Sequence, residues 1–110
     1  MIPHPLITFA AGLHAIEPSL LLSPSRRSEV VRARYVAIWL LAQDGHYNEA
    51  IGRFMNRDGS TIGHALNKVA TTPPLKAHCE RCRAQLMRMA TLADAGRPQL
   101  HLVGMARKGA

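Results

Sequence analysis

The side chains of this sequence that are best suited to chemistry form a short polar run, Arg57-Asp58-Gly59-Ser60-Thr61. Guanidinium, carboxylate and hydroxyl groups hydrogen-bond the edges of bases and the oxygens of phosphates. Short polar groups at the beginning of a helix also let that helix approach bases closely, and the free N–H groups there can meet a phosphate. The run therefore favours contact with a nucleic acid.

A second group of chemically capable side chains consists of His78, Cys79 and Cys82. The two cysteines form one CxxC, and the sequence has no second CxxC to complete a four-cysteine zinc site. Cysteines three residues apart on an apolar helical face are more often buried thiols. We therefore expect no metal and no cofactor, and we keep a zinc or redox site as the alternative. His64 is expected to pack or to bond the backbone rather than to bind a metal.

The sequence does not favour catalysis. It shows no paired carboxylates and no phosphate-cradling loop of the form GxxxxGK(S/T). His78 stands next to Cys79 in the chain, which is not the spatial arrangement of a nucleophile and its base. We therefore expect a binding protein and not an enzyme.

Arginine dominates the charge of the chain. Fourteen Lys and Arg face seven Asp and Glu, which gives a formal net charge of +7, and eleven of the fourteen are Arg. The planar guanidinium fork matches phosphate and guanine edges, so double-stranded DNA is a better expectation than a membrane surface. The apolar stretch 5–16 is too short to span a membrane. We expect a cytoplasmic protein associated with the nucleoid.

Helical periodicity organises the rest of the chain. Apolar residues recur at helical spacing in five segments, with a short helical turn within 17–25; the segments are 5–16, 28–43, 47–55, 58–70 and 75–95. Asp58 is suited to cap one helix, and Pro73-Pro74 to end it. We expect an all-α domain over 1–96 with a helix-turn-helix at 47–70, followed by a basic, loosely ordered tail at 97–110.

One run of residues resembles a known family. Ile51-Gly52-Arg53-Phe54-Met55-Asn56-Arg57-Asp58-Gly59-Ser60-Thr61-Ile62-Gly63-His64-Ala65, followed by Lys68, is similar to the C-terminal DNA-binding domain of the bacterial replication initiator DnaA. Upstream similarity includes Pro18, Leu21-Leu22-Ser23, Arg26 or Arg27, Val31-Arg32-Ala33-Arg34 and Ala37. The resemblance covers roughly residues 5–70. It implies a Trp-repressor-like bundle of about five to six helices that contains a helix-turn-helix.

The resemblance also implies roles for individual side chains. Arg57, Asp58, Ser60 and Thr61 would face bases or phosphates in the major groove. Arg32 would reach the neighbouring minor groove, and Lys68 would hold the DNA backbone. Further phosphate contacts would come from Arg34 and Arg53.

The sequence departs from the family at two of these positions. Gly59 stands where the family usually has histidine, and Ser60 where it usually has threonine, so we expect a preferred sequence different from the initiator's usual box. The ATPase part is also absent from this sequence. The leading hypothesis is a sequence-specific duplex DNA binder that regulates transcription or replication initiation. The alternative is a non-catalytic protein-interaction module on the same fold, which partners the replication or transcription machinery through the apolar N-terminal segment.

Overall fold

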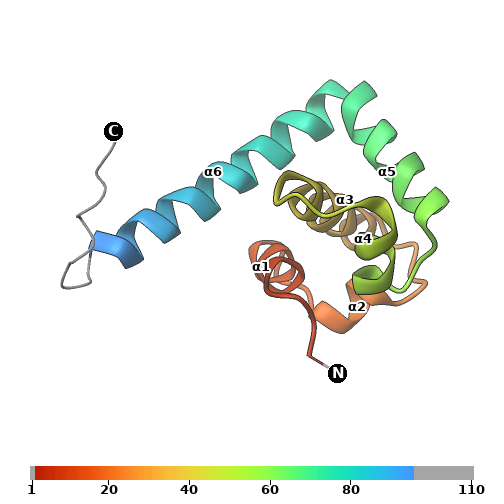
Figure 1. Ribbon diagram of the computed structural model, residues 1–110, viewed down its shortest axis with the longest axis horizontal. Coiled ribbons are helices and arrows are strands. Elements are labelled where there is room, and N and C mark those ends of the chain that lie inside the picture. The colour runs from red at the N-terminus through yellow and green to blue at the C-terminus, as the bar shows by residue number, and fades with distance from the viewer. Residues whose placement is uncertain (1, 96–110) are drawn as a thin grey trace.

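The computed structural model describes residues 2–95, and within that range the chain forms helices and no strand (Figure 1). The helices are α1 (Pro5–Leu13), α2 (Pro18–Leu22), α3 (Ser28–Gln43), α4 (Asn48–Met55), α5 (Gly59–Thr71) and α6 (Pro73–Ala95). The expected all-α fold with a helix-turn-helix is confirmed. The tail expected at 97–110 lies outside the described residues. Among the described helices, none is both long and apolar enough to cross a membrane.

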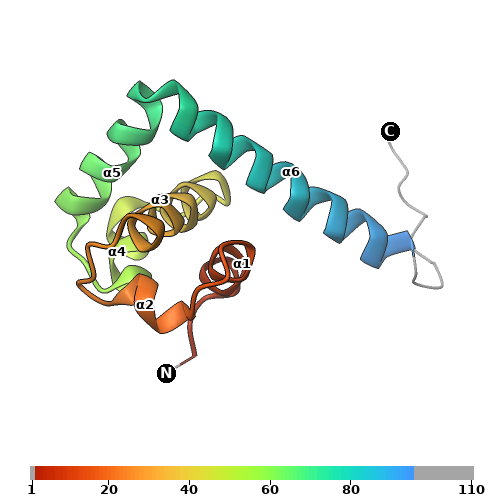
Figure 2. The same ribbon diagram turned by 180° about the vertical axis from the view of Figure 1, so that it is seen from behind.

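The helix α3 is the centre of the bundle. Its apolar residues recur on nearly all sides, and those that are buried are Val30, Ala33, Val36, Ala37, Ile38, Leu40 and Leu41. Each of the other five helices packs against it, as the two opposite views show (Figures 1 and 2). A helix that is apolar almost all round must be covered almost all round. The arrangement of the whole domain therefore follows from this one segment.

The turn between α4 and α5 is fixed by Asn56 and by Gly52. Asn56 adopts a left-handed backbone conformation with φ of 60°, which asparagine tolerates better than most residues. The backbone N–H of Arg57 donates to the carbonyl of Gly52 over 2.8 Å. A Cβ on Gly52 would lie 2.4 Å from the carbonyl oxygen of Arg57, so only glycine fits this close approach.

The helix α6 begins at Pro73, two residues earlier than expected. Proline has no N–H to lose in the first turn of a helix, so Pro73-Pro74 both ends α5 and begins α6. Only the first half of α6 packs against the bundle. Cys79 and Cys82 are buried and Leu86 packs against the core, but Met89 is 49% exposed, because the later turns extend beyond the bundle (Figure 1).

The apolar N-terminal segment is shorter as a helix than expected, since α1 ends at Leu13 and not near Ile16. Its buried residues Ile7, Ala10 and Ala11 belong to the core and pack on α3. The segment is therefore part of the bundle. Most of its apolar side is covered within the domain, and contact of this segment with a partner protein stays a prediction.

Candidate nucleic-acid interface

A groove of about 720 Å³ runs between α5, the first half of α3 and the loop that joins α2 to α3. In Figure 2 this loop passes beside the beginning of α5. Polar and cationic side chains supply much of the lining, which consists of Pro24, Ser25, Arg26, Val31, Arg34, Tyr35, Ile38, Arg57, Thr61, His64, Ala65 and Lys68. Four of these residues are Arg or Lys, and none of the described residues that line the groove is acidic.

Two arginines on the inner side of the groove bind backbone carbonyls. The guanidinium of Arg34 donates four hydrogen bonds, to the carbonyl oxygens of Leu20, Leu21, Ser23 and Ser25, over 2.8 to 3.2 Å. The fork of arginine suits such a cluster of acceptors, because its donors point in fixed directions. Arg34 therefore holds the end of α2 and the following loop against α3.

Arg57 reaches the same loop from the other side, out of the α4–α5 turn. It donates to the carbonyl oxygens of Ser23 over 2.6 Å, Met55 over 2.8 Å and Leu21 over 3.4 Å. The sequence analysis expected Arg57 to face bases or phosphates and Arg34 to meet phosphates. In the structure, most of the N–H donors of Arg34 and several of those of Arg57 instead form hydrogen bonds within the protein.

The charges of these two guanidinium groups have no counter-charge in the described part of the chain. Neither forms an ion pair within residues 2–95. Burial lowers the pKa of both groups, and the nearby charge of Arg57 lowers the pKa of Arg34 further. Arginine nevertheless stays protonated in proteins. The inner side of the groove is thus positively charged, and an anion would relieve that charge.

One face of α5 forms the opposite side of the groove. Thr61, His64 and Lys68 are exposed and follow one another at helical spacing. Arg26 is exposed on the loop across from them. A hydroxyl, an imidazole and two long cations can reach an anionic ligand here without moving the backbone.

The beginning of α5 is a capped helix end. Asp58 is its N-cap, as the sequence predicted, and its Oδ1 accepts hydrogen bonds from the backbone N–H of Thr61 over 3.0 Å and from the hydroxyl of Ser60 over 2.9 Å. These bonds lower the pKa of the carboxyl group, the bond from the Thr61 backbone most of all. The Asp58 carboxylate therefore accepts hydrogen bonds within the first turn of α5, whereas Ser60 and Thr61 are exposed beside it.

Two glycines in α5 face α4 and not the solvent. A Cβ on Gly59 would lie 3.6 Å from Cγ of Glu49, and a Cβ on Gly63 would lie 3.4 Å from Nδ2 of Asn48. Both positions therefore serve the packing of α5 on α4, and neither glycine points to a ligand.

The other expected contact residues lie apart from the groove. Arg32 is exposed and lines a shallower groove of about 380 Å³, between α3 and the beginning of α6, together with Ser28, Thr72 and Leu75. Arg53 is exposed on α4 and lines neither groove. The structure thus brings together Arg34, Arg57, Thr61 and Lys68 of the residues named from the sequence.

His64 was placed wrongly by sequence reasoning. It was expected to pack or to bond the backbone, but it is exposed and lines the groove. The signal that identifies it is helical spacing: it stands three residues after Thr61 and four before Lys68. The two cysteines, in contrast, are buried as expected.

The chain was compared with known protein families and with curated proteins. A model of the family described as bacterial dnaA protein helix-turn-helix matches residues 6–69. The matched region covers more than half of the chain and runs from α1 almost to the end of α5. The comparison with curated proteins gives no match.

Proposed function

We propose that this chain, which belongs to the bacterial dnaA helix-turn-helix family, binds double-stranded DNA sequence-specifically and thereby regulates transcription or replication initiation. Membership of the family implies DNA binding and a non-catalytic module. The regulatory role, the choice of sequence and the use of the major groove are our proposal. Regulation would follow from occupancy of a site on the nucleoid in the cytoplasm.

One observation carries the proposed site. The groove holds four cations, lacks an acidic lining residue among those described, and includes two guanidinium groups without a counter-charge there. DNA phosphates supply the missing charge, and their contacts set most of the affinity. We therefore assign the DNA face to the groove and to the first turns of α5.

The residues divide into contacting and positioning groups in this proposal. Lys68 and Arg26 meet phosphates, and Ser60, Thr61 and His64 read base edges as α5 enters the major groove. Arg34 and Arg57 position the loop that carries Arg26, and their positive charge attracts the DNA backbone. Asp58 holds the tip of α5. At the margins, Arg32 reaches the neighbouring minor groove and Arg53 meets a phosphate.

Selection of duplexes from a random pool at two salt concentrations tests this function. The proposal expects one enriched motif that persists at the higher concentration, with affinity falling steeply as salt rises. If the enrichment disappears at higher salt, the chain binds DNA only through attraction to its phosphates. No enrichment at either concentration would contradict sequence-specific binding.

Two single variants separate the two kinds of contact. Thr61→Ala should relax the preference at one position of the motif and leave the salt dependence unchanged. Lys68→Ala should weaken binding to all duplexes and reduce the log–log salt slope by about 0.9. If Thr61→Ala binds the motif with unchanged specificity, the tip of α5 does not read bases through Thr61.

A protein-interaction role remains the second candidate, and the later turns of α6 favour it. Met87 and Leu92 are 53% and 72% exposed there, together with Met89. Exposed apolar residues of this size are common at protein contacts. A Met87→Ser and Leu92→Ser double variant that keeps full DNA affinity but loses its function in the cell would support this second role.

A further inference from the structure

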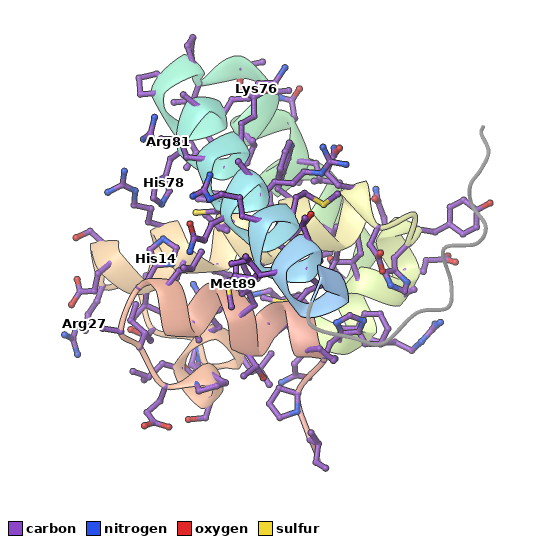
Figure 3. The ribbon with its side chains drawn as sticks, turned by 90° about the vertical axis from the view of Figure 1, so that its left-hand side faces the viewer. His14, Arg27, Lys76, His78, Arg81 and Met89 are labelled. Atoms are coloured by element: carbon purple, nitrogen blue, oxygen red, sulfur yellow. The ribbon has the colours of Figure 1, made fainter. Side chains whose placement is uncertain are left out.

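A cluster of metal-binding side chains lies away from the DNA groove, where α1 meets α6. His14 caps the end of α1, and His78 and Cys82 lie one turn apart on α6. The Nε2 atoms of the two histidines are 2.8 Å apart, and Sγ of Cys82 is 3.8 Å from Nε2 of His78. Figure 3 shows His14 and His78 pointing toward one another across the gap between the two helices.

The hydrogen bonding of His14 prepares one of these atoms as a ligand. Its Nδ1 lies 2.6 Å from the carbonyl oxygen of Ala10. A carbonyl can only accept, so Nδ1 carries a proton, and in the neutral tautomer that this bond selects Nε2 is the unprotonated atom that faces His78. Metal-bound histidines commonly have their second ring nitrogen held in this way by a backbone carbonyl.

The separations of the three donor atoms suit a small divalent ion. All three lie within 4.8 Å of one another. Tetrahedral zinc has bonds of about 2.0–2.1 Å to nitrogen and about 2.3 Å to sulfur, which separates neighbouring donors by about 3.3–3.6 Å. Changes of about half an ångström to one ångström in these separations, by rotation of the side chains, would bring the cluster to that geometry. Two imidazoles and a thiolate are ligands that zinc prefers.

We propose that His14, His78 and Cys82 form a Zn²⁺ site that fastens α6 to α1. On binding, the Cys82 thiol releases its proton to solvent, the proton of His78 moves to Nδ1, and all three donors bind through free electron pairs. A water molecule takes the fourth position from the pocket of about 320 Å³ that these residues line with Leu13, Arg81, Gln85 and Arg88. The ion would connect the matched family region to the helix that follows it.

Cys79 is not part of the cluster. It is buried, and burial together with the neighbouring Cys82 raises its thiol pKa to about 11. The site therefore uses one cysteine of the CxxC, together with His78 and a histidine 64 residues before His78 in the chain.

Titration of the reduced, metal-free full chain with Co²⁺ tests the site directly. The proposal expects one equivalent to bind with a sulfur-to-cobalt charge-transfer band, and Zn²⁺ to displace it. A second cluster, His4, Asp44 and His46, also gathers three ligand atoms within 4.8 Å but contains no sulfur. Bound cobalt without the sulfur band, or no bound cobalt, would overturn the proposal.

A matched pair of cysteine variants identifies the thiolate. Cys82→Ala should abolish the sulfur band and weaken zinc binding at least about tenfold, since even outer-shell partners of metal ligands matter that much. Cys79→Ala should keep the band and the stoichiometry, and zinc should still raise its Tm. If Cys79→Ala loses the band and Cys82→Ala keeps it, the proposed ligand set is wrong. Far-ultraviolet circular dichroism checks that both variants fold, and the wild-type cobalt spectrum stands independently of either.

Discussion

Arg34 and Arg57 donate hydrogen bonds to the same two carbonyl oxygens, those of Leu21 and Ser23, although they come from α3 and from the α4–α5 turn. The shared acceptors tie the helix-turn-helix to the loop that carries Arg26. The two sides of the groove are therefore held at a fixed separation. Residues that the sequence suggested as DNA contacts act first as supports of the proposed DNA face.

Arg34→Lys should lower the free energy of unfolding by about 1–3 kcal/mol, because a lysine cannot reach four carbonyls and leaves part-buried acceptors unpaired. Arg53→Lys is the matched control. Arg53 is exposed on α4, so the change should stay within about 0.5 kcal/mol. Urea unfolding followed by circular dichroism measures both. Equal stability of the two variants would contradict the supporting role of Arg34.

Gly52→Ala should destabilise the domain by about 1–3 kcal/mol, because the new methyl group would collide with the carbonyl of Arg57. Gly12→Ala should have the opposite effect on stability. Outside the neighbouring backbone of α1, no atom lies within 4 Å of a Cβ added at Gly12, so alanine should stabilise by about 0.5–1 kcal/mol. Thermal unfolding of the two variants should give shifts of opposite sign. A neutral Gly52→Ala would refute the tight α4–α5 turn.

Asp58→Ala should lower the free energy of unfolding through loss of the cap on α5. Asparagine caps helices about as well as aspartate, so Asp58→Asn should recover most of that loss. Denaturant unfolding of the three proteins, with DNA affinity measured beside it, distinguishes the cap from a direct contact. If Asp58→Asn loses affinity while keeping full stability, the carboxylate itself contacts the DNA.

Stability of the metal-free chain should fall as the pH drops from about 7.5 to about 5.5. The pKa of His78 is lowered, mainly by burial and then by neighbouring cations, and burial also lowers that of His4. The folded state therefore binds protons more weakly than the unfolded state, whose histidines have a pKa near 6.5. The stabilisation is full above that value and is lost below it. His78→Gln should flatten the curve, and a stability that rises on acidification would contradict the argument.

Local patterns in the sequence were enough for much of the fold. The bounds of α3, the cap at Asp58 and the pair of helices around Asn56 each depend on neighbouring residues, and periodicity and capping rules use just those neighbours. The start of α6 was missed because Pro73-Pro74 carries two opposite signals, the end of one helix and the first turn of the next.

The candidate site was less predictable, because its contacts join distant segments. In the sequence, Arg34 and Arg57 cannot be told apart from Lys68 as candidate phosphate contacts, because all three are cations. Only the structure shows that the two arginines donate hydrogen bonds to carbonyls of residues 20–25 and so hold the loop in place. His14 gave no sign of pairing with His78, since the two meet only when α6 packs beside α1. A pattern within one segment cannot show which other segment it will meet.

The salt dependence of duplex affinity, measured by fluorescence anisotropy, tests the assignment of the groove as the DNA face most directly. Arg26→Ala/Lys68→Ala removes two groove cations, and Arg83→Ala/Arg88→Ala removes two exposed cations on α6. Both change the net charge equally. The groove pair should reduce the log–log slope by about 1.8, and the α6 pair should leave it unchanged. An unchanged slope in the groove pair, or equal losses in both, would contradict the assignment.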